Sequence, residues 1–147
     1  MDTFHNNDRG SVLREIDAVA AAGRQDWRSH PGIAAWFEDE SDLLQAMQTR
    51  WVHVLTGCLD VAIETGSGNL VQDVREAYGL ARQHHPGLWA ILTEHAQHPA
   101  IAAAVRREHA LLARTACVEH STEVTTRASV FVPEQRKPWF KRLLAAA

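Results

Sequence analysis

The chain has 147 residues, of which 46% are hydrophobic and 22% charged, and its formal net charge is -3. This length suits one domain that buries roughly two-thirds of its unfolded surface, and the composition excludes wholesale disorder. Acidic residues are spread along the chain and no basic face is concentrated, which excludes nucleic acid as the main partner. No apolar run reaches the roughly 20 residues that span a bilayer. Because Met1–Gly10 is no signal peptide, a cytoplasmic protein is expected.

Apolar residues that recur at steps of three and four predict a succession of helices separated by proline, glycine and polar residues. The expected helices are Ser11–Ala22, a short piece from Pro31, Asp39–Thr65, one from Asn69 to Pro86, one of about three turns around Leu88–His95, and Pro99–Glu119. The sequence therefore predicts an all-α fold, an irregular bundle of five to six helices around one long central helix.

The segment Asp39–Thr65 carries the clearest helical pattern in the chain. Acidic residues open it, where the backbone N–H groups favour negative charge, and Gly66 and Gly68 follow its end. Its apolar residues fall on one stripe, so Trp51 is expected in the core. The stripe consists of Leu44, Met47, Trp51, Leu55, Cys58 and Ala62.

The dipeptide His-Pro occurs three times, at His30-Pro31, His85-Pro86 and His98-Pro99. Proline is well suited to the first position of a helix, since the N–H group that it lacks would have no partner there. Each of the three is therefore predicted to start a helix.

The character of the sequence changes at Ser121. Ala128–Val132 is a short β-prone run with no second strand to pair with it, and prolines bracket the polar segment that follows. Residues 1–120 are therefore predicted to form a helical bundle domain, and residues 121–147 an extended tail with a short amphipathic end.

The end of this tail combines apolar and basic side chains. Trp139 and Phe140 cannot be buried within so short a segment, and Lys137 and Arg142 lie beside them. We expect the tail to bind an acidic surface such as Glu38–Asp42, on the same chain or on a second protomer, or else another protein partner.

Nine histidines make metal binding a hypothesis to weigh, although Glu-x-x-His, His-Glu-x-x-His and Cys-x-x-Cys are absent. A tight turn at His98-Pro99 would bring His109 close to His84 and His85, with Glu108 as a carboxylate ligand. The alternative is that His85 starts a helix, His84 lies in solvent and His109 is a core histidine. Under the preferred interpretation no cofactor is expected.

Haem is a second cofactor to consider, because the length and the helical pattern would suit a globin. His84 or His85 would then bind the iron, and Phe37 would pack against the haem. The break at Pro99 interrupts the long helix that a globin needs, which argues against this hypothesis.

Five tryptophans are many for a chain of this size. A buried tryptophan needs a partner for its N–H group, so tryptophans favour pocket walls and interfaces as well as cores. The aromatic residues expected to line a ligand groove or an interface are Trp36, Phe37, Trp51, Trp89, Trp139 and Phe140. Burial in the core is the alternative for all of them.

No catalytic signature accompanies these residues. Cys58 and Cys117 lie in apolar stripes, where two buried free thiols are expected and not reactive nucleophiles, and no serine lies in a Gly-x-Ser-x-Gly elbow. The sequence therefore favours a non-enzymatic binding or regulatory module of a bacterial-type cytosolic protein, a candidate homodimer with an apolar ligand. The alternative is a histidine-ligated metal or haem protein with a redox or sensing role.

Val74–Cys117, with its Tyr78-x7-Pro86-Gly87-Leu88 pattern, resembles the helical ligand-binding domains of TetR-type repressors. In that family a helix that ends before a Pro-Gly break precedes a pair of dimerising helices. The DNA-binding helix-turn-helix of those repressors has no counterpart in this acidic N-terminal region. The chain is therefore not assigned to that family.

Overall fold

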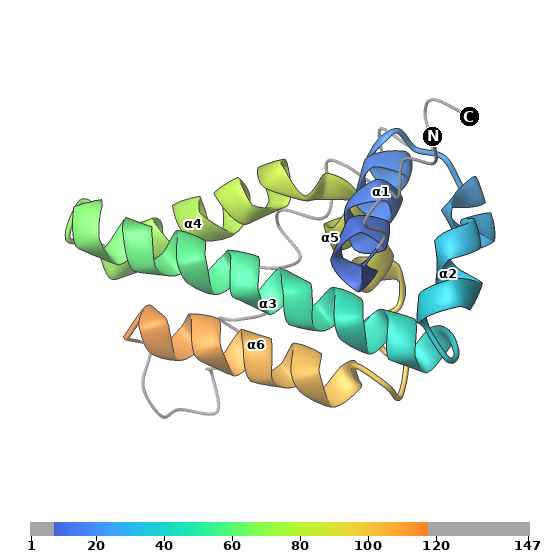
Figure 1. Ribbon diagram of the computed structural model, residues 1–147. Helices are drawn as coiled ribbons and strands as arrows, with labels where there is room; N and C mark the ends of the chain where they lie inside the picture. The colour runs from blue at the N-terminus through green and yellow to red at the C-terminus, as the bar shows by residue number, and fades with distance from the viewer. Residues whose placement is uncertain (1–7, 118–147) are drawn as a thin grey trace.

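The computed structural model describes residues 8–117, which form six α-helices and one 3-10 turn (Figure 1). The elements are α1 (Arg9–Ala21), η1 (Asp26–Ser29), α2 (Pro31–Trp36), α3 (Glu40–Thr65), α4 (Leu70–His84), α5 (Pro86–Glu94) and α6 (Ala102–Thr115). The described part of the chain contains no strand, which confirms the all-α prediction. The β-prone run Ala128–Val132 and the predicted tail lie outside the described residues.

Helix α3 is the centre of the bundle. Figure 1 shows α4 along one side of it and α6 along the other, while α1, α2 and α5 gather around its N-terminal half. The most extensive packing is between α3 and α4, followed by that between α1 and α5. Among the described residues, no helix is both long and apolar enough to cross a membrane.

The predicted stripe of α3 forms the core over most of its length. Asp39 caps the helix, since its carboxylate accepts a hydrogen bond from the N–H of Asp42 at 2.8 Å. Trp51 is only 2% exposed, as predicted, but Cys58 is only partly buried. The C-terminal end of α3 extends beyond the core, and Val61 in this part of the helix is 58% exposed.

Two His-Pro-Gly segments start α2 and α5, and their glycines allow both helices to pack closely against α1. Pro31 and Pro86 are the first residues of these helices, which confirms two of the three predicted helix starts. A Cβ atom on Gly32 would lie 2.6 Å from the Val12 side chain, and one on Gly87 would lie 2.0 Å from the backbone oxygen of Asp17. Only glycine permits this close approach to α1.

The third predicted helix start is wrong. Pro99 lies in a turn, and α6 begins three residues later at Ala102. In this turn the Nδ1 of His98 accepts a hydrogen bond from the N–H of Ala100 at 3.2 Å. Helix α6 ends at Thr115, before the predicted end at Glu119.

Candidate functional site

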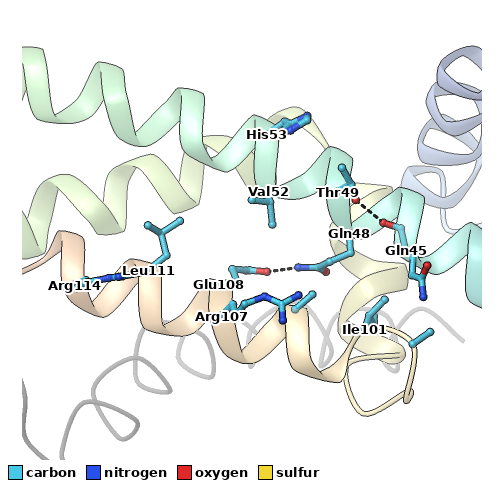
Figure 2. Close-up of a pocket in the computed structure, with 12 residues that line it drawn as sticks. Gln45, Gln48, Thr49, Val52, His53, Ile101, Arg107, Glu108, Leu111 and Arg114 are labelled. Carbon is cyan, nitrogen blue, oxygen red and sulfur yellow. Dashed lines mark hydrogen bonds between the residues drawn. The ribbon is translucent and has the colours of Figure 1, made fainter.

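A groove of about 620 Å³ lies between α3 and α6 (Figure 2). This size is in the range of small-molecule sites. Helix α3 supplies mostly polar lining residues, whereas α6 and the turn before it supply apolar and charged ones. The lining residues are Gln45, Gln48, Thr49, Val52, His53, Ala100, Ile101, Ala104, Arg107, Glu108, Leu111 and Arg114.

A buried carboxylate forms the floor of this groove. Glu108 is 7% exposed, and Gln48 opposite it is 3% exposed. The Nε2 of Gln48 donates to one carboxylate oxygen of Glu108 at 2.8 Å, and the Nε1 of Trp51 donates to the other at 3.0 Å. These two hydrogen bonds offset much of the cost of burying the carboxyl group.

Gln48 leaves one of its own groups unmet. Its Oε1 is buried and has no hydrogen-bond partner among residues 8–117. The Nε2 of the amide faces Glu108, which suits a carboxylate because a carboxylate only accepts. A buried acceptor without a donor costs about 1–3 kcal/mol. Gln48 lines the groove, so a ligand donor that reaches this oxygen would satisfy it.

The rim and the walls of the groove add positive charge and apolar surface. Arg107 and Arg114 are exposed and form no ion pair with any residue in the 8–117 range. Figure 2 shows Arg107 and Arg114 on the α6 side, with Val52 on α3 and Leu111 on α6 between the helices. One end of a ligand would thus meet apolar side chains and another a guanidinium group.

An aromatic cluster lies beneath the floor. The rings of Trp51 and Tyr78 meet edge to face at 5.8 Å, and the Nε1 of Trp89 donates to the Tyr78 hydroxyl at 3.0 Å. A cavity of about 20 Å³ among these rings also touches Gln48 and Glu108, and it has room for one water molecule. The cluster fixes the ring of Trp51 and, through it, the carboxylate of Glu108.

The structure distributes the aromatic residues that the sequence assigns to a groove. Trp51 and Trp89 come together in the cluster, beneath the α3–α6 groove. Phe37 lines a separate cavity of about 520 Å³ at the start of α3, and Trp36 is 45% exposed. Trp139 and Phe140 lie outside the described residues.

The residues of the metal hypothesis have other surroundings. His84 is exposed, and the Nδ1 of His85 lies 2.6 Å from a carboxylate oxygen of Asp17. Glu108 is bonded to Gln48 and Trp51, and His109 beside it is only partly buried. Within residues 8–117, no group of three or more His, Cys, Asp or Glu side chains could hold a metal ion.

The cysteines are separate thiols. Cys58 is partly buried, and burial raises the pKa of its thiol, which disfavours the nucleophilic thiolate. Cys117 is exposed, so the expectation of two buried thiols is wrong for this residue. It follows the last turn of α6, where the backbone leaves the helix with a φ of 53°.

Sequence reasoning missed Gln48, the residue that gives the groove its polar floor. A signal was present, since Gln48 is a polar residue between Met47 and Trp51 on the buried side of α3. Likewise Glu108 lies four residues before the buried Leu112 on α6. A polar residue at an apolar position of a helix indicates a buried partner.

No family model, no curated protein and no solved structure matches this chain. A functional proposal therefore depends on the geometry of the groove.

Proposed function

We propose that this chain is a non-enzymatic binding module whose α3–α6 groove takes a small amphipathic molecule. The observation that carries the proposal is the Oε1 of Gln48, buried at the floor without a donor among the described residues. Native proteins rarely leave such an acceptor unmet, and a ligand donor would meet it. The apolar walls, and the guanidinium groups of the rim that form no ion pair within residues 8–117, favour a ligand with an apolar body and an anionic group.

The test is to close the groove and measure the binding of a fluorescent probe, 1-anilinonaphthalene-8-sulfonate. This probe combines an apolar ring system, an N–H donor and an anion. Ala104 lines the groove, so Ala104→Phe would fill it. Ala103, the preceding residue of α6, is exposed and does not line the groove, so Ala103→Phe is the matched control.

The expected result is that Ala104→Phe weakens probe binding at least tenfold, whereas Ala103→Phe leaves it unchanged. Circular dichroism of both variants checks that the helices are retained. Equal probe affinity in the two variants would mean that the probe binds elsewhere, and the proposed function would be wrong.

We also propose self-association through residues 121–147, with the cavity at the start of α3 as the receiving surface. Its walls include Trp27 and Phe37, and Glu38 and Glu40 stand exposed at its edge. Apolar walls beside acidic groups complement a segment that carries both aromatic and basic residues, such as 137–144. Glu38→Lys with Glu40→Lys should lower the molecular mass measured by light scattering. An unchanged mass would contradict this surface.

The cellular setting that we propose is the cytoplasm. Cys58 and Cys117 form no disulfide, which suits a reducing compartment. Fractionation of the native host cell would test this location.

A further inference from the structure

We infer that the ligand of the α3–α6 groove is an apolar α-amino acid. This inference rests on the proposed function and specifies its ligand class. It follows from the chemistry of three parts of the groove, which are its floor, its rim and its walls.

The floor of the groove favours a ligand group that donates hydrogen bonds and carries a positive charge. The Oε1 of Gln48, which has no donor among the described residues, belongs to the same amide that donates to Glu108. A donor that reaches this oxygen therefore enters the field of a buried carboxylate, where the low dielectric strengthens its interaction with a cation. A primary ammonium group supplies both the charge and up to three donors.

The rim of the groove favours an anionic group close to that ammonium group. Arg107 precedes Glu108 directly in α6 and lines the same groove, and it has no ion pair with another described residue. Arg114 lies two turns farther along the helix, about 10 Å away. The nearer guanidinium group, that of Arg107, matches an anion carried close to the ammonium, as in an α-amino acid. Its planar fork binds a carboxylate through two parallel hydrogen bonds.

The walls of the groove favour a ligand with an apolar side chain. Val52 of α3 and Leu111 of α6 face the groove between its charged ends, and Ile101 is buried at its edge. Ala100 and Ala104 are small and leave space beside them. A zwitterion with a large hydrophobic side chain therefore fits the three surfaces together, whereas a purely apolar ligand would leave Gln48 unmet.

The experiment is an isothermal calorimetric titration of the full-length protein with each of three related compounds. L-Phenylalanine has all three features, N-acetyl-L-phenylalanine lacks the ammonium group, and L-phenylalaninamide lacks the carboxylate. We expect L-phenylalanine to bind about tenfold more tightly than either analogue, because each analogue leaves a charged or polar group of the groove unmet.

A matched pair of variants assigns the carboxylate to its partner. Arg107→Met keeps the length of the side chain and removes its charge, and Arg106→Met does the same at an exposed position that does not line the groove. Arg107→Met should weaken L-phenylalanine at least threefold and leave L-phenylalaninamide unchanged. Arg106→Met should change neither.

Two outcomes would overturn the inference. One is that N-acetyl-L-phenylalanine binds as tightly as L-phenylalanine, and the other is that Arg107→Met and Arg106→Met behave alike. If none of the three compounds binds while Ala104→Phe still excludes the fluorescent probe, the ligand class is wrong and the proposed binding function stands. If Ala104→Phe fails to exclude the probe, the binding function itself is wrong.

Discussion

The two His-Pro-Gly segments share a sequence and both pack against α1, but their histidines act differently. At the start of α2, the Nδ1 of His30 accepts from the N–H of Gly32 at 3.1 Å, so the histidine caps its own helix. Its Nε2 is then free to donate to Glu15 of α1 at 2.7 Å.

At the start of α5, the cap comes from another helix. His85 makes no side-chain capping bond, and instead the carboxylate of Asp17 accepts from the N–H of Leu88 at 2.8 Å. The other carboxylate oxygen of Asp17 forms a hydrogen bond with the Nδ1 of His85 at 2.6 Å. One helix start is thus stabilised locally and the other by tertiary structure, so identical tripeptides should tolerate substitution very differently.

Gly87→Ala should have the largest effect. The new Cβ would lie 2.0 Å from the backbone oxygen of Asp17 and 2.7 Å from the backbone nitrogen of Ala21, so α5 would have to move away from α1. We expect a loss of about 3 kcal/mol in the free energy of unfolding, despite the better helix propensity of alanine. Urea denaturation followed by circular dichroism measures it. A stabilised variant would show that the two helices are not in close contact.

Asp17→Ala should have the next largest effect. It removes the cap of α5 and leaves the buried N–H of Leu88 without its acceptor, which costs about 2 kcal/mol. Asp17→Asn retains an acceptor oxygen and should recover part of this loss in the same denaturation experiment. If alanine and asparagine are equally tolerated, the cap is not supplied by α1.

Gly32→Ala should cost less than Gly87→Ala, about 1 kcal/mol. Its Cβ would meet a side-chain methyl of Val12 at 2.6 Å, and a side chain can shift more readily than a backbone. Thermal denaturation of the two glycine variants side by side gives the comparison directly. The reverse order would contradict the assignment of the tighter contact to α5.

Glu15→Ala should have the smallest effect, below about 0.5 kcal/mol. Its side chain is 49% exposed, so its bond to His30 is screened by solvent. The cap of α2 does not depend on Glu15, because the Nδ1 of His30 provides it. A loss as large as that of Asp17→Ala in chemical denaturation would remove the distinction between the two helix starts.

The sequence predicts what is set by local chemistry. Proline and apolar spacing place the starts of α2 and α5. Helix α4 begins directly after Asn69, where the sequence predicts a helix start, and the side chain of Asn69 caps it by accepting from the N–H of Gln72 at 3.2 Å. Pro99 is the exception: it lies in a turn, and α6 begins at Ala102, although the Nδ1 of His98 makes the same bond to the residue after its proline as the Nδ1 of His30 does.

Features that depend on contacts between distant segments are not visible in the sequence. The bond between Gln48 and Glu108 joins residues 60 positions apart, and the cap from Asp17 to Leu88 joins residues 71 positions apart. Local periodicity does not specify such pairs. It indicates only that a polar residue occupies a position on a buried face.

The uneven burial of the tryptophans gives the protein an optical reporter of its own. Trp36 is 45% exposed, whereas Trp27, Trp51 and Trp89 are each at most 5% exposed. A water-borne quencher such as iodide should silence Trp36 selectively among these four. The indole of Trp51, bonded to the carboxylate under the groove, would then register a change in its electric field when the groove fills, as a shift in emission wavelength that needs no attached dye.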